Sequence, residues 1–154
     1  MPPPLGGPVP ETTSMAQLTA PALLAARVLL SFMFILSGIQ KITGYAGTVG
    51  YMEAMGVPGV LLPLAILTEV VGGIAVLVGW QTRIAAFLLA GFSVVAGYLF
   101  HYAAIGGQDA MADMMQQIMF FKNLAIAGGF LALVGVGAGA WSLDARSGRE
   151  LATA

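Results

Sequence analysis

Residues 84–105 read IAAFLLAGFSVVAGYLFHYAAI, and this stretch decides the fold. No Asp, Glu, Lys or Arg occurs between residues 84 and 108. A helix over residues 83–105 would be roughly 35 Å long at about 1.5 Å per residue, and the hydrocarbon core of a bilayer is about 30 Å thick. The stretch therefore predicts a helix that crosses a membrane.

Three further segments have the same character, at residues 21–41, 59–80 and 118–140. Backbone polar groups in lipid must be paired within the segment, so long apolar runs become helices. Only Gln81-Thr82 separates the second and third segments, and so short a link requires an antiparallel hairpin. The predicted fold is all-α, an integral membrane four-helix bundle with short interfacial helices in the loops.

The composition agrees with a membrane protein. Of the 154 residues, 58% are hydrophobic and only 8% are charged, with a net charge of −1. A soluble globular domain carries roughly 25% charged residues, so an ordinary soluble enzyme is excluded. The chain has no basic patch for nucleic acid, and its lack of cysteine excludes disulfides, thiolate metal sites and thiol nucleophiles.

We divide the chain into three parts. Residues 1–20, with prolines concentrated at their start, are expected to form a flexible tail; residues 21–146 form the transmembrane domain, and 147–154 a C-terminal tail. Within the domain, the methionine-rich loop at 106–117 is expected to hold a short interfacial helix.

The charges outside the spans predict an orientation. An even number of spans places both termini on one side, which carries Arg83, Arg146 and Arg149. The other side carries Lys41 and Lys122 together with acidic residues. The positive-inside rule then places both termini in the cytoplasm.

Each span carries a stripe of small or polar residues at helical spacing. Small residues allow membrane helices to approach closely, so we expect the four stripes to face one another. The stripes are Arg27, Ser31, Phe34, Gly38 and Lys41; Ala65, Glu69, Gly72, Gly73 and Val76; Arg83, Ala86, Ala90, Ser93, Gly97 and His101; and Lys122, Ala125, Gly129, Ala132 and Val136.

Three ionisable residues fall inside the spans. Glu69 lies near the middle of its span, and Arg27 and Lys122 each lie roughly 7–9 Å from it in depth by helix rise. Such residues usually face the bundle interior and are paired. They predict either a structural ion pair between Glu69 and a basic partner or a proton or ligand site; pairing is the expected role of Arg27 and Lys122.

The remaining site candidates are Lys41, Asn123 and His101. Lys41 lies at the rim of the first span, and Asn123 follows Lys122 in the fourth. His101 is the single histidine, close to several methionines that could bind Cu(I) with it. A lone histidine makes no metal site without partners, so we predict none.

Short motifs occur in a characteristic order and spacing along the chain. They are Arg27 to Lys41, Gly56-Val-Pro58, Glu69-Val-Val-Gly72-Gly73, Gly79, Thr82-Arg83, Phe121-Lys122-Asn123, Gly128-Gly129, Gly137 and Ser142-Leu143-Asp144. With these residues the chain resembles the DoxX-like family over residues 22–146. The resemblance implies a four-helix protein of the bacterial inner membrane; the family takes its name from a subunit of a thiosulfate:quinone oxidoreductase, and other members are linked to redox stress.

Two classes of function remain open at this point. In the first, the chain is an accessory subunit of a redox system and binds quinone between its helices, with Lys122, Asn123 or Glu69 at the ligand. In the second, it is a membrane scaffold, an assembly factor or a small-solute carrier, which would need a central cavity or a homo-oligomer. The bilayer is the expected partner in both, with other membrane or redox subunits in the first.

Overall fold

The computed structural model describes residues 11–107 and 109–148. In these residues all regular structure is helical: α1 (Glu11–Thr43), α2 (Tyr45–Ala54), the 3-10 turn η1 (Gly59–Leu61), α3 (Leu62–Val78), α4 (Thr82–Phe100), the 3-10 turn η2 (Tyr102–Ala104), α5 (Ala110–Val136) and α6 (Leu143–Arg146). Four segments are long and apolar enough to cross a membrane: Leu18–Thr43, Gly59–Val78, Thr82–Ala104 and Ala110–Val136. The predicted four-helix membrane bundle is confirmed, and α2 is a short helix within the first loop.

Two helices begin earlier than their predicted spans. Helix α1 begins at Glu11, ten residues before the expected start, because the residues from 11 to 20 contain no proline and Pro21 is tolerated within the helix. The flexible tail predicted at 1–20 is therefore wrong for residues 11–20. Its remaining residues, 1–10, and residues 149–154 of the predicted C-terminal tail lie outside the described residues.

The methionine-rich segment is not a separate interfacial helix. It forms the first turns of α5, which begins at Ala110 instead of residue 118. The Asp109 carboxylate accepts hydrogen bonds from the backbone N–H groups of Met111 and Ala112, both at 3.0 Å. These bonds satisfy donors that a helix start otherwise leaves unpaired, so the helix extends beyond its apolar part.

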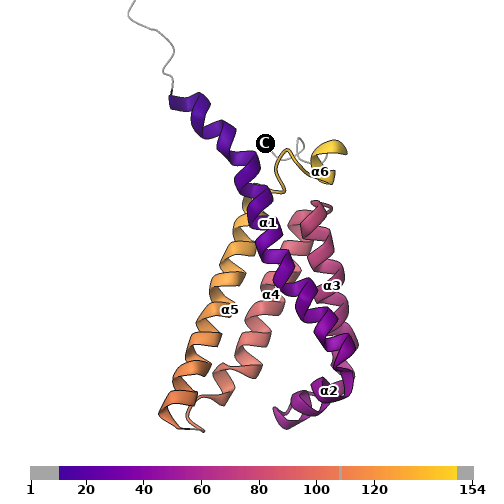
Figure 1. Cartoon of the computed structure of the whole chain (residues 1–154), viewed down its shortest axis with the longest axis vertical. Helices are drawn as coiled ribbons and strands as arrows, with labels where there is room; N and C mark the ends of the chain where they lie inside the picture. The colour runs from indigo at the N-terminus through magenta and orange to yellow at the C-terminus, as the bar shows by residue number, and fades with distance from the viewer. Residues whose placement is uncertain (1–10, 108, 149–154) are drawn as a thin grey trace, which may run out of the picture.

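The four long helices form two antiparallel pairs (Figure 1). Helix α1 packs along α3, and α4 packs along α5. The pairs are joined through α3 and α4 and diverge from one end of the molecule to the other. We call the end with the α3–α4 turn and α6 the closed end, and the end with α2 and η2 the open end.

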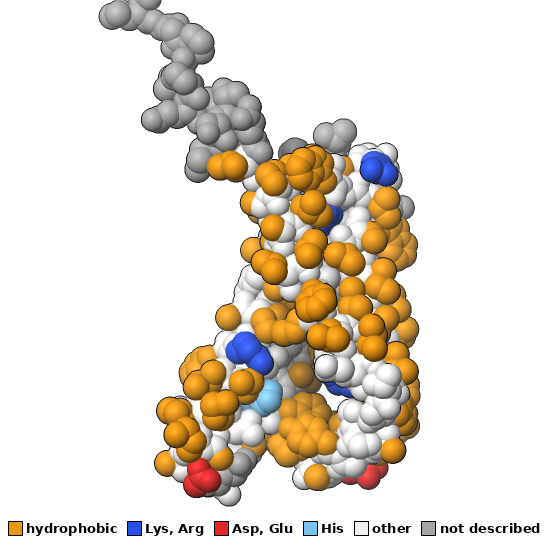
Figure 2. All heavy atoms as spheres, viewed as in Figure 1, with side chains coloured by type: hydrophobic (Ala, Val, Ile, Leu, Met, Phe, Trp, Pro, Cys, Tyr) orange, Lys and Arg blue, Asp and Glu red, His pale blue; other side chains and the backbone are white. Residues whose placement is uncertain are grey.

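The core lies where the pairs meet. Ala86, Ala90 and Ser93 of α4 are buried, as their stripe predicted. The rings of Phe34 and Phe130 form a T-shaped contact, with centroids 5.3 Å apart. The face drawn in Figure 2 carries hydrophobic side chains over the height of the bundle, as a lipid-facing surface requires.

The stripe predicted for the fourth span is wrong. Lys122, Ala125 and Ala132 are exposed, whereas Ala127, Phe130 and Leu133 of α5 are buried. Small residues occur on several faces of α5, so small size does not mark its packed face. The large Phe130 ring fixes the rotation of α5 instead.

Candidate functional site

A cavity of about 1210 Å³ opens between the two helix pairs. Figure 2 shows it as a hollow between two lobes, with basic and histidine side chains at its edge. Its walls are largely apolar, and its polar groups gather toward the open end. They include Ser37 and Lys41 of α1, Glu69 of α3, His101 at the end of α4, and Lys122 and Asn123 of α5.

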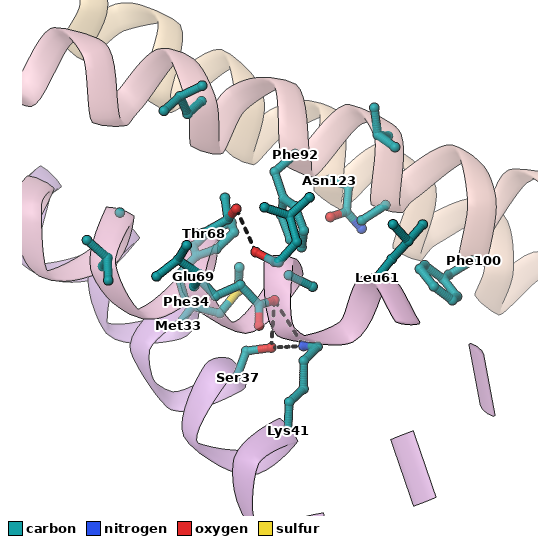
Figure 3. Close-up of a pocket in the computed structure, with 18 of the residues that line it drawn as sticks. Met33, Phe34, Ser37, Lys41, Leu61, Thr68, Glu69, Phe92, Phe100 and Asn123 are labelled. Carbon is teal, nitrogen blue, oxygen red and sulfur yellow. Dashed lines mark hydrogen bonds and ion pairs between the residues drawn. The ribbon is translucent and has the colours of Figure 1, made fainter. Parts of the chain in front are cut away.

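Three of these side chains form one polar cluster. Lys41 Nζ donates to Glu69 Oε1 at 2.9 Å and to Ser37 Oγ at 2.6 Å, and Ser37 Oγ donates to Glu69 Oε1 at 3.2 Å. Figure 3 shows the three groups pointing toward one another from α1 and α3. Glu69 is only 4% exposed, so its charge is held by this pairing and not by solvent.

The local sequence explains the cluster. Ser37 and Lys41 are four residues apart and therefore share one face of α1. Gly38 allows that face to approach α3, because a Cβ atom at this position would lie 2.5 Å from Val70 Cγ2. The close approach brings Glu69 within hydrogen-bond distance of both α1 side chains.

The two oxygens of the Glu69 carboxylate are in different situations. Oε1 accepts two of the three hydrogen bonds of the cluster, whereas Oε2 is buried and has no hydrogen-bond partner among the described residues. Buried polar atoms are nearly always hydrogen-bonded in proteins. Oε2 therefore has an unused capacity to accept a hydrogen bond.

The cavity wall opposite the Lys41–Glu69 pair is formed by α4 and α5 and carries further polar side chains. Asn123 Nδ2 donates to the Met119 carbonyl oxygen at 2.9 Å, which leaves its second N–H without a partner in the described structure. His101 Nδ1 lies 2.8 Å from Gln116 Oε1. Lys122 is exposed and donates to the Met119 sulfur at 3.0 Å.

The predicted candidates are thus only partly brought together. Glu69 pairs with Lys41. The prediction that Arg27 or Lys122 would be its partner is wrong, because helix rise gives the depth of a residue in the membrane but not the direction in which its side chain points. Arg27 lies at the closed end, 1% exposed, and its Nη2 donates to the Trp141 carbonyl oxygen at 2.6 Å. It does not line the cavity.

Sequence reasoning missed Ser37 and the polar lining residues Gln40, Thr48 and Thr68. A signal for Ser37 was present, because it precedes Lys41 by one helical turn. Among the residues that the structure describes, no group of three or more His, Asp or Glu side chains is arranged to hold a metal ion.

The fold and the cavity define the class: an integral membrane protein with four spanning helices, in which a buried glutamate pairs with a partly exposed lysine beside a large cavity. The sequence model of the DoxX family matches residues 22–102, more than half of the chain. The chain belongs to the DoxX family.

Two relatives support this assignment. The inner membrane protein YqjF of Escherichia coli (strain K12) is 48% identical over 93 residues, which cover 60% of this chain and 66% of that protein. The inner membrane protein YphA of the same organism is 37% identical over 97 residues, covering 62% of this chain and 68% of YphA. The matches thus span about two thirds of each relative. No solved structure matches significantly. The protein is an integral inner-membrane member of its family.

Proposed function

We propose that the protein binds the ring of a membrane quinone in this cavity and acts as an accessory subunit of a quinone-linked redox system. The observation that carries the proposal is the buried Glu69 Oε2, which has no described partner, next to the Lys41 ammonium group. Ionisable groups at membrane depth are functional candidates, and this one faces a cavity.

The donors and acceptors suit both redox states of such a ring. Lys41 Nζ uses two of its three hydrogens within the cluster and has one left for a carbonyl oxygen of the oxidised ring. Glu69 Oε2 can accept a hydrogen bond from a hydroxyl of the reduced ring. The second N–H of Asn123 offers another donor from the opposite wall.

The apolar walls suit the rest of the ring. Phe34 and Phe92 line the cavity beside Glu69, with their own centroids 6.3 Å apart (Figure 3). Ligand sites are usually apolar with a few placed polar groups, and aromatic walls stack on or pack edgewise against planar rings. The residues present therefore fit an uncharged planar ring with oxygen atoms at its edge.

A bound quinone supplies two-electron, two-proton chemistry, with the electrons delivered by a partner redox protein. Lys41 holds a positive charge toward the ligand oxygen, where negative charge develops on reduction. Glu69 and Ser37 fix the Lys41 ammonium group in position, and Glu69 Oε2 can receive or return a proton. The apolar walls exclude water, which strengthens these electrostatic effects.

Binding of a radiolabelled short-chain quinone to the detergent-purified protein tests the proposal. We expect saturable binding that weakens about tenfold or more in Glu69→Gln and in Lys41→Met, equivalent to at least 1.4 kcal/mol. Glu53→Gln is the matched control, because Glu53 is exposed and does not line the cavity. Absence of saturable binding, or equal effects of Glu53→Gln and Glu69→Gln, would overturn the proposal and favour a scaffold or carrier.

A further inference from the structure

The cavity continues far beyond the polar cluster. Its lining residues on α4 recur every three or four positions from Ile84 to Phe100, which corresponds to roughly 24 Å of helix. From the level of Glu69 toward the closed end, the space between α3 and α4 has largely apolar walls, with Gln81 as a polar residue beside Trp80 at the far end. We call this part the apolar arm; it is bounded by Gly72, Ala75, Trp80, Ile84, Ala85 and Leu88.

Small side chains form the inner wall of the arm. Gly72 and Ala75 of α3 and Ala85 of α4 are among its lining residues, and the Leu89 side chain packs against Gly72. Trp80, in the turn after α3, closes the far end about 11 residues from Glu69, or roughly 16 Å by helix rise. Ile84 and Leu88 are largely exposed at its edge, so the arm is open to the bilayer along its side.

We propose that the apolar arm holds the hydrocarbon chain of the ligand whose ring lies at the Lys41–Glu69 cluster, and that this ligand is a long-chain isoprenoid quinone. This inference rests on the proposed function. The cavity is continuous from the cluster to Trp80, and its volume of about 1210 Å³ exceeds the roughly 300–1,000 Å³ of a usual small-molecule pocket. A ring alone leaves the arm empty, whereas an attached chain fills it.

Charge argues against a phospholipid as the occupant. The arm begins at Glu69, in the interior of the span Gly59–Val78. A phospholipid whose head group lay at the cluster, with a tail in the arm, would bring its anionic phosphate to the depth of a buried carboxylate, which costs several kcal/mol. The head group of a quinone is uncharged and carries no such penalty.

The chain gains little from leaving the surrounding lipid, because lipid tails are as apolar as the arm. Its contribution comes from packing against fixed walls. We therefore expect a long-chain quinone to bind about tenfold more tightly than a short-chain one, a modest 1.4 kcal/mol.

Photolabelling tests the position of the chain. The probe is a benzoquinone with a photoreactive group at the end of an alkyl chain about 16 Å long, bound to the full-length protein in nanodiscs. We expect mass spectrometry to find the label between Trp80 and Leu88. Labelling of lipid-facing residues of α5, such as Leu131 and Val136, to the same extent would overturn the inference.

One pair of variants separates filling of the arm from a general effect on the helix. Leu88→Trp replaces an aliphatic side chain in the arm with the larger indole ring. Leu88 is 58% exposed, so the substitution does not strain the core. Phe87→Trp is the matched control, 62% exposed on the same helix and outside the cavity. Leu88→Trp should lower labelling about tenfold, equivalent to 1.4 kcal/mol, and Phe87→Trp should leave it within twofold.

Short-chain quinone binding distinguishes the two ways in which the account can fail. If the short-chain ligand binds through Glu69 but the long chain gives no added affinity and labels no arm residue, the inference fails and the proposed function stands. If neither ligand binds, both are wrong. If the long chain labels the arm equally in Glu69→Gln, the arm binds lipid chains without the ring site, which contradicts the inference.

Discussion

Ionisable side chains are buried at both ends of the bundle, but their hydrogen-bond partners differ: backbone groups at the closed end and another side chain at the open end. At the closed end the Asp144 carboxylate accepts hydrogen bonds from the backbone N–H groups of Gln81 and Thr82, each at 2.9 Å. Arg27 donates to the Trp141 carbonyl oxygen at the same end. At the open end Lys41 and Glu69 bond to each other beside the cavity that both residues line, and Glu69 Oε2 is buried without a partner in the described structure.

This difference suggests two roles for buried charges. Side chains bonded to the backbone hold segments of the chain together, and at the closed end they fasten the C-terminal segment onto the α3–α4 turn. The Lys41–Glu69 pair bonds side chain to side chain next to a cavity, and we propose this pair as the ligand site.

Gly79→Ala should have the largest effect on stability. Gly79 has a φ of 72°, and a Cβ atom there would overlap Arg27 Nη1 and the Ser142 side chain. Left-handed backbone and overpacking together are expected to lower the free energy of unfolding by about 3–5 kcal/mol. Thermal unfolding in detergent measures this loss.

Gly56→Ala is the control for the backbone contribution. Gly56 has a similar φ of 74°, but nothing lies within 4 Å of the Cβ position. Its substitution should cost only about 1–2 kcal/mol. Equal losses at the two glycines would show that the closed end is not tightly packed around Arg27.

Lys41→Met should rank second, with a loss of about 2–3 kcal/mol in the free energy of unfolding. The substitution leaves the Glu69 carboxylate buried without its partner, and the 26% exposure of the Lys41 side chain limits the cost. The double variant Lys41→Met/Glu69→Gln should recover more than half of the loss. Additive losses in this double-mutant cycle would contradict a paired cluster.

Asp144→Ala should lower the free energy of unfolding by about 2 kcal/mol, because two backbone N–H groups at the start of α4 lose their acceptor. Asp109→Ala is the matched control, since Asp109 caps α5 in an exposed position and should cost about 1 kcal/mol. A larger loss for Asp109→Ala would mean that the closed end does not depend on Asp144.

The variants that test the predicted membrane orientation should change stability the least. The chain has no cysteine, so single cysteines at the exposed positions Ser147 and Thr43 report the two ends without background. With both termini in the cytoplasm, an impermeant thiol reagent added to intact cells should label Thr43→Cys and spare Ser147→Cys. The reverse pattern would contradict the positive-inside assignment.

The spans and the inward position of Glu69 could be predicted from the sequence. The signals for them, hydropathy and the placement of small residues, can be read within a single helix without knowledge of its neighbours. The 22 residues of IAAFLLAGFSVVAGYLFHYAAI are long and apolar enough to specify a spanning helix without any neighbour. Glu69 had to face inward because a charge toward lipid is costly.

The partner of Glu69 and the rotation of α5 could not be predicted in this way. The depth of a residue in the membrane does not specify the side of its helix from which the side chain projects. This side differs between Lys41, Arg27 and Lys122. The packed face of α5 depends on the contact of Phe130 with Phe34, and the role of Asp144 depends on a C-terminal segment that folds back over another helix. These are tertiary contacts between distant parts of the chain.

The most direct test of the account is native mass spectrometry of the protein released from mild detergent. We expect wild type and Glu53→Gln to retain one quinone per chain, and Glu69→Gln to retain at most about a tenth of that amount, equivalent to 1.4 kcal/mol. Wild-type protein that carries no quinone, or equal quinone in Glu69→Gln, would contradict the assignment of the Lys41–Glu69 cluster as a quinone site.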